Sequence, residues 1–271
     1  MLVPLPRAVV SAAALTLLAW SNGPSGNTGT DSTAECTDPP YATHDWIADH
    51  ALALLPEEER AWLQPHRAVY LIGTEAPDND EIAAGCGTPN RGYDDRSRGH
   101  SVEWNASWTT MVKDRAAVRA REEYQKAIAA YQDGDAKAAA FYLGAMAHYT
   151  GDVSQYGHAV PWESPASHSA YEGWAARRTT SFDGGPFQST VQLDQLVTRT
   201  PYTAVKRISR ATARGQDAIL SATDMEERQN AREAPEFLAS VAASLNLGVN
   251  ELADVLHTFY RNVVAEEDPE P

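Results

Sequence analysis

Long apolar runs are scarce in this 271-residue sequence. The one that stands out covers residues 8–20, behind a lone positive charge at Arg7, and a stretch rich in Ser, Gly, Asn and Thr follows it. A run of this length is too short to span a bilayer comfortably, and the pattern is typical of a secretory signal. We therefore expect residues 1–20 to be removed and the protein to be secreted, outside the cell or into the periplasm. An N-terminal membrane anchor is the alternative.

Cysteine is also rare, with Cys36 and Cys86 as the two examples. Export places a protein in an oxidising environment, in which two cysteines can pair. A disulfide between them would tie the segment before the first expected helix to the loop after Asp78. Two free thiols are the alternative, because sequence alone does not show which cysteines pair.

Basic side chains are outnumbered, with 22 Lys and Arg against 37 Asp and Glu, and the formal net charge is -15. The sequence has no dense cluster of Lys and Arg of the kind that follows a polyanion. We therefore expect no stable nucleic-acid partner. A bound metal could still hold a phosphodiester locally, so the charge weakens the case for nucleic-acid hydrolysis without excluding it.

Sustained alternation of apolar and polar residues is absent, so the sequence gives no evidence for a sheet. Apolar residues instead recur at three- and four-residue intervals, as they do on one face of a helix. The hydrophobic content of 43% is ample for one core. We predict an all-α fold with a single helical domain at residues 41–265, after a flexible segment at 21–40 and before a disordered tail at 266–271.

Local signals divide this domain into segments. Thr43 fits an N-cap for the first helix, and Pro56 ends that helix. A polar loop rich in Pro, Gly, Asp and Asn extends from residue 75 to residue 100, a length that is usually functional in a compact domain. Helices are predicted at residues 44–55, 57–63, 104–131, 136–150, 167–177, 191–198, 202–222 and 235–264.

The strongest chemical signal lies at the end of the predicted helix at residues 136–150. That helix is apolar on nearly every side, which is typical of a helix at the centre of a domain. His148 and Asp152 are four residues apart and project from one helical face, and His158 follows. Burying this pair among apolar residues is costly unless a cation binds both side chains. The alternative is a solvent-facing pair.

A second pair with the same spacing, His168 and Glu172, begins sixteen residues after Asp152. Two such pairs with a third His between them are much harder to reach by chance. Mixed imidazole and carboxylate groups suit zinc better than calcium or magnesium, which prefer oxygen ligands. Asp78 and His100 lie towards the two ends of the polar loop and are further candidates, although spacing says nothing about their distance from the helix.

Five motifs follow one another in a fixed order. They are His44-Asp-Trp-Ile, Gly73-Thr-Glu-Ala-Pro-Asp78, His100, the segment from Phe141 to His158, and His168-Ser-Ala-Tyr-Glu172. This series resembles the bacterial zinc-dependent phospholipase C family, which is related to the secreted zinc-dependent single-strand nucleases of fungi. The resemblance covers residues 41–174, and its most specific part is the segment from Phe141 to His158.

The resemblance implies a helical domain with three zinc ions. The first ion would be bound by Asp78, His100, His148 and Asp152, and the second by His158, His168 and Glu172. The third would take His44, a shared carboxylate from Asp152, and the amino and carbonyl groups of the mature N-terminal residue. Cleavage after Ala19 would make Trp20 that residue. Another terminus could substitute, or the third site could be weak or empty.

The resemblance also implies an activity. Zinc-activated water would hydrolyse phospholipids to diacylglycerol and a phosphorylated headgroup, with Asp78 as the catalytic residue that orients the water or accepts its proton. We expect a monomer that contacts the membrane peripherally to reach its phospholipid substrate. Two alternatives stay open: a single-strand nuclease or nucleotidase on the same scaffold, and a secreted zinc-binding protein without catalytic activity.

Overall fold

Helices make up nearly all of the regular structure in the computed structural model, which describes residues 40–78, 99–160 and 165–265. The prediction of an all-α fold is therefore confirmed, with one small exception at residues 103–113. None of the helices in these ranges is both long and apolar enough to cross a membrane. The proposed signal at 1–20, Trp20, Cys36, Cys86 and the tail at 266–271 lie outside the described residues, and the domain boundaries stay predictions.

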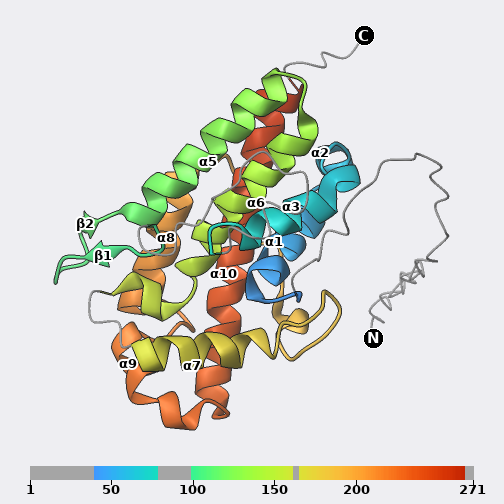
Figure 1. Ribbon diagram of the computed structural model, residues 1–271. Coiled ribbons are helices and arrows are strands. Elements are labelled where there is room, and N and C mark those ends of the chain that lie inside the picture. Colours follow the sequence, from blue (N-terminus) through green and yellow to red (C-terminus); the bar gives the residue numbers. More distant parts are fainter. Residues whose placement is uncertain (1–39, 79–98, 161–164, 266–271) are drawn as a thin grey trace, which may run out of the picture. The chain divides into compact units, whose positions relative to one another are not determined.

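The α-helices in the described ranges keep the labels of Figure 1. They are α1 Thr43–Leu54, α2 Glu57–Arg60, α3 Arg67–Glu75, α5 Arg115–Gln132, α6 Ala136–Asp152, α7 Pro165–Ala176, α8 Pro201–Arg214, α9 Ala222–Glu227 and α10 Pro235–Phe259. Short 3-10 turns occur at η1 Gln64–His66, η2 Tyr156–Ala159, η3 Gln188–Thr190 and η4 Gln229–Ala231, and a π-helical turn, η5 Tyr260–Val264, continues α10.

The most buried helix is α6, as its apolar sequence predicts. It packs against α1, α3, α5, α8 and α10, and almost all of its residues from Ala138 onward are buried. Figure 1 shows α5 and α6 side by side, with the long α10 behind them. The side chain of Asp135 caps the N-terminus of α6 by accepting a hydrogen bond from the N–H of Ala138. The last turn of α6 therefore lies in the interior.

Two glycines let α3 approach α6 closely. A Cβ atom at Gly73 would collide with the carbonyl oxygen of Phe141, and one at Gly144 would collide with the carbonyl oxygen of Tyr70. Only glycine permits this backbone contact. The close approach brings the C-terminal end of α3 beside the C-terminal half of α6, where the chemically interesting residues lie.

The predicted helix over 104–131 is wrong in its first third. Residues 103–113 instead form an antiparallel hairpin, β1 Glu103–Trp104 and β2 Met111–Lys113, and the helix begins at Arg115. The reason is local, since the side-chain oxygen of Asn105 accepts hydrogen bonds from the N–H groups of Thr109 and Thr110. The expectation of no sheet therefore fails for this short ribbon, because side-chain hydrogen bonds of this kind compete with helix formation.

The predicted helix at 191–198 is also wrong. This segment has no helical structure and lies along α10, with the backbone N–H groups of residues 192, 194, 197 and 199 hydrogen-bonded to side chains of that helix. The four acceptors recur every four residues on α10: Asn246, Asn250, Asp254 and Thr258. Tertiary contacts thus satisfy the donors that a helix would have used internally.

The predicted helix at 202–222 is correct only over its first two thirds. α8 ends at Arg214, because Gly215 follows with a φ of 84° and caps the helix in a conformation that other residues rarely adopt. A tight turn pairs Gln216 with Ile219 before Ser221 caps the separate helix α9. The predicted helix therefore extends eight residues too far, and α9, which begins where it was expected to end, was not predicted.

Candidate metal centre

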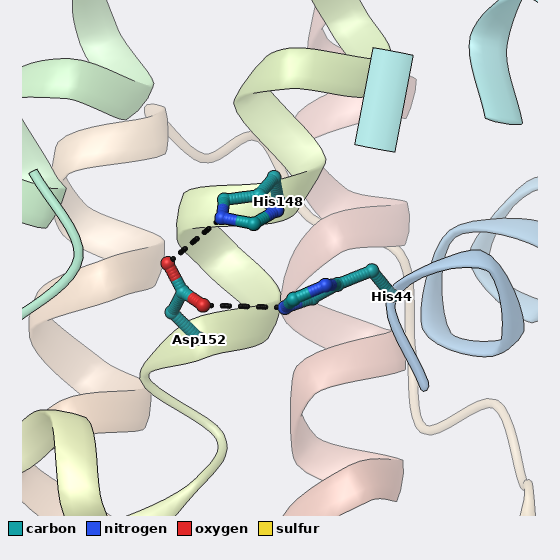
Figure 2. A group of neighbouring side chains, drawn as sticks. All are labelled: His44, His148 and Asp152. Atoms are coloured by element: carbon teal, nitrogen blue, oxygen red, sulfur yellow. Dashed lines mark hydrogen bonds and ion pairs between the residues drawn. The ribbon is translucent and has the colours of Figure 1, made fainter. Parts of the chain in front are cut away.

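The last turn of α6 carries the centre of the candidate site. Asp152 is only 2% exposed in its side chain, and His148, one turn earlier, is fully buried. The Nε2 atom of His148 lies 3.3 Å from Oδ2 of Asp152. Figure 2 shows Asp152 in contact with both this imidazole and that of His44, whose Nε2 atom lies 3.2 Å from Oδ1. Both oxygens of one buried carboxylate therefore face imidazole nitrogens.

Two more imidazoles approach the same carboxylate. His100 places Nδ1 2.9 Å from Oδ2 of Asp152, and His158 places Nε2 3.7 Å from Oδ1. His158 is held in η2, where its carbonyl oxygen accepts a hydrogen bond from the N–H of Val102 just before β1. The hairpin that the sequence did not predict is thus joined through this bond to the site.

Asp78 closes the first group of candidate ligands. Its Oδ1 lies 3.6 Å from Nε2 of His100, and its Oδ2 lies 3.9 Å from Nε2 of His148. These three residues have ligand atoms within 4.8 Å of one another. The side chain of Asp78 is 50% exposed, whereas those of His100 and His148 are largely or fully buried. Asp78 is therefore the outermost member of the group.

A second group forms where α7 faces η2. Oε1 of Glu172 lies 3.0 Å from Nε2 of His158 and 3.0 Å from Nε2 of His168, which precedes it by one turn of α7. The two imidazole rings are 4.4 Å apart. Because His158 also lies beside Asp152, this second group is continuous with the first.

His44 enters from the first turn of α1. Gly151 makes room for it, because a Cβ atom at that position would lie 2.9 Å from Cδ2 of the His44 ring. The rings of His44 and His148 are 4.2 Å apart. The structure therefore brings together all eight residues that the sequence analysis selected. They are His44, Asp78, His100, His148, Asp152, His158, His168 and Glu172.

Two residues that sequence analysis did not select also contact the site. The backbone carbonyl oxygen of Thr74 lies 2.6 Å from Nδ1 of His148, and Oε1 of Glu75 lies 4.0 Å from Nδ1 of His44. Both residues precede Asp78 in the motif that begins at Gly73. A backbone carbonyl leaves no trace in a sequence, and Glu75 gains significance only when α3 is placed against α6.

The carboxylate of Asp152 is balanced by its imidazole neighbours. Burial alone would raise the pKa of Asp152, but His148, His158 and His100 hold it well below its ordinary range. Burial would lower the pKa of His44 and His100, yet Asp152 outweighs it and raises these pKa values to about 10 and about 9. Burial does prevail at His148 and lowers its pKa to about 4. In the chain alone, protons on His44 and His100 thus supply positive charge that a divalent cation could replace.

The donor set fits zinc. Five imidazoles and three carboxylates converge within the described part of the chain, and mixtures of His with Asp or Glu are common in catalytic zinc sites. Calcium and magnesium prefer shells of oxygen alone. Of the eight histidines in the sequence, His50, His66 and His257 lie elsewhere, and His50 is a buried residue that stacks on Phe182.

Zinc binding is expected to release protons and to strengthen as the pH rises. At pH 7 the raised pKa values keep His44 and His100 protonated, and zinc requires the neutral imidazoles. The apparent affinity should therefore increase from pH 6 to pH 8, by about tenfold per pH unit for each proton displaced. Calorimetry in buffers of different ionisation enthalpy measures the protons released. Binding heats that do not depend on the buffer would contradict the expectation.

Sequence comparison assigns the chain to a known group. The profile of the family described as zinc-dependent phospholipase C matches residues 43–223. This range contains all eight residues of the cluster. No curated protein matches the chain significantly in sequence.

Two clostridial toxins of known structure have a similar fold. Alpha-toxin from Clostridium absonum matches with a TM-score of 0.52 and 17% identity over 83% of this chain and 66% of the toxin chain. Alpha-toxin from an avian strain of Clostridium perfringens matches with a TM-score of 0.54 and 19% identity over 89% and 67%. This chain thus spans about two thirds of each toxin, and at these identities the likeness shows the fold alone. Because the family profile matches well over half of the sequence, the chain belongs to the zinc-dependent phospholipase C family.

Proposed function

We propose that the protein is a secreted zinc-dependent phospholipase C that hydrolyses phospholipids to diacylglycerol and a phosphorylated headgroup. The observation that carries this proposal is the continuous cluster of five imidazoles and three carboxylates around the buried Asp152, in a chain of this family. Secretion is supported by the apolar run at residues 8–20. The enzyme acts as a monomer that meets its substrate at a membrane surface.

Zinc would be held by three groups of these side chains. One ion fits Asp78, His100, His148 and Asp152, and a second fits His158, His168 and Glu172. A third fits His44 together with Asp152. Bound zinc supplies a Lewis acid that neutralises charge on the phosphate and lowers the pKa of water towards neutrality.

The protein's own contribution to hydrolysis centres on Asp78. Its carboxylate lies at the edge of the cluster and is the most exposed of the three. A carboxylate in this position can orient the attacking water and accept its proton, and then pass the proton to solvent. Asp152 is unsuited to this role, because it is buried beneath four imidazoles.

Charge explains how an acidic chain can bind an anionic substrate. The formal charge is -15, which repels phosphodiesters at long range. Three carboxylates offset only half of the charge of three divalent ions, so the loaded cluster carries local positive charge. The cluster itself would therefore bind the substrate phosphate, and the sequence has no dense run of Lys and Arg that a long polyanion could follow.

A panel of phosphodiesters tests the proposal. Purified protein should release diacylglycerol from short-chain phospholipids, and a zinc chelator should abolish the release. Single-stranded DNA should be hydrolysed much more slowly, and Asp78→Asn should lower phospholipid turnover by about 10²–10⁴-fold, whereas the exposed Asp133→Asn should not. Faster hydrolysis of DNA would replace the proposal with a nuclease. No hydrolysis of any substrate despite bound zinc would indicate a non-catalytic zinc protein.

A further inference from the structure

Glu75 occupies an unusual position for an acidic residue. It is the last residue of α3, its side chain is 20% exposed, and its Oε1 atom is buried. Within the described part of the chain this oxygen has no hydrogen-bond partner. A buried carboxyl oxygen without a partner costs stability unless another state of the protein supplies one.

The neighbours of Glu75 do not explain its burial in the chain alone. Burial raises the pKa of Glu75, and among the described groups Asp78 and Asp152 raise it further while His44 lowers it. The separation of 4.0 Å from Nδ1 of His44 is too long for a hydrogen bond, so no described neighbour satisfies the buried oxygen. A purely structural role for this carboxylate is therefore poorly supported.

The imidazole of His44 lies between two carboxylates. Its Nε2 atom faces Asp152 at 3.2 Å, on the side of the cluster, and its Nδ1 atom faces Glu75 on the opposite side. A neutral imidazole carries one proton, so a proton on Nδ1 leaves the Nε2 lone pair free for a metal. Metal-binding histidines commonly donate their second N–H to a carboxylate or a backbone carbonyl, which fixes the ring and makes it a stronger ligand.

The adjacent residue already makes such a contact. The carbonyl oxygen of Thr74 lies 2.6 Å from Nδ1 of His148, which leaves Nε2 of that ring facing Asp152. Thr74 and Glu75 are consecutive at the end of α3, and the Gly73 and Gly144 contact fixes both against α6. The C-terminal end of α3 thus faces the Nδ1 atoms of His148 and His44.

We propose that Glu75 is a positioning residue for His44, accepting a hydrogen bond from Nδ1–H and thereby holding Nε2 towards a zinc ion shared with Asp152. This inference rests on the proposed zinc centre but not on phospholipid hydrolysis. A small movement of the flexible Glu75 side chain closes the 4.0 Å gap once zinc fixes the ring. Glu75 then strengthens zinc binding at His44, whether or not the N-terminal residue is also a ligand.

Glu75→Gln tests the proposal through zinc binding without any substrate. The variant keeps the size of the side chain and removes the negative charge. Titration against a competing chelator should show one zinc ion bound about 10–100-fold more weakly, with the affinities of the other ions unchanged. The matched variant Glu58→Gln, at an exposed position of α2, should bind zinc as the wild-type protein does.

Two further readouts separate positioning from structure. In excess chelator, the urea midpoint of Glu75→Gln should equal or exceed that of the wild-type protein. In the zinc-loaded wild-type protein labelled with ¹⁵N-histidine, His44 should carry its proton on Nδ1, identified against the spectrum of His44→Ala. Unchanged zinc affinities, a proton on Nε2, or a lower midpoint in chelator would each overturn the proposal. If the wild-type protein binds zinc but hydrolyses no phospholipid, the proposed function is overturned and the role of Glu75 is not.

Discussion

Asp152→Asn is expected to abolish hydrolysis and to lower thermal stability together. One carboxylate lies beside His44, His100, His148 and His158, and each of its two oxygens faces two of these rings. An amide of the same shape presents one oxygen and one NH₂ group, so it cannot bridge two cations or balance the imidazoles. Turnover should fall by at least about 10³-fold, since loss of a metal removes several kcal/mol of transition-state stabilisation.

The stability effect of Asp152→Asn follows from burial. Removing one partner of a buried charged pair costs about 3–5 kcal/mol, which for a domain of this size lowers the melting temperature by about 10 °C. His148→Ala should show the same two losses, because it removes a fully buried ligand. Asp133→Asn and His66→Ala are matched controls outside the cluster and should retain both properties. Full activity in either cluster variant would refute the assignment of the site.

Removal of zinc should cause a large and reversible loss of both activity and stability. The cluster joins α1, α3, α6, α7 and the residues around His100 and His158, so a bound cation crosslinks segments that are distant in the sequence. Binding to the folded state alone stabilises it by about 4 kcal/mol per ion at a thousandfold excess over Kd. Differential scanning calorimetry with excess chelator should therefore show a melting temperature lowered by roughly 10 °C or more.

The choice of cation provides the control for this experiment. Zinc added back after dialysis should restore the original melting temperature and the activity. Magnesium or calcium should not, because imidazole ligands do not suit them. A melting temperature that is indifferent to chelator, or equal recovery with magnesium, would contradict the assignment of a zinc centre.

Sequence analysis correctly predicted the helices whose own apolar pattern determines how deeply they are buried. α6 is apolar on nearly every side, and the structure places it among five other helices. The errors at 103–113 and 191–198 share a different cause. In both places side-chain oxygens, from Asn105 or from α10, accept the backbone N–H groups that a helix would otherwise use. Periodicity of apolar residues contains no information on such contacts.

The residues of the candidate site also fall into those that sequence spacing selects and those that only tertiary structure brings together. Spacing alone selected the pairs on α6 and α7, because residues four apart share a helical face. His44, Asp78 and His100 depended on resemblance to a family, since their convergence is a tertiary property. The contacts of Thr74 and Glu75 were not predictable by either route. They depend on the docking of α3 on α6 through Gly73 and Gly144, which is a property of the folded chain.

The central claim is that eight imidazole and carboxylate side chains bind a cluster of zinc ions around Asp152. Diffraction from crystals of the purified protein, recorded on both sides of the zinc absorption edge, tests it most directly. The account predicts anomalous peaks within about 2.0–2.2 Å of ligand atoms of Asp152, His148 and Glu172. Crystals without a peak at these residues, from protein supplied with zinc, would contradict it.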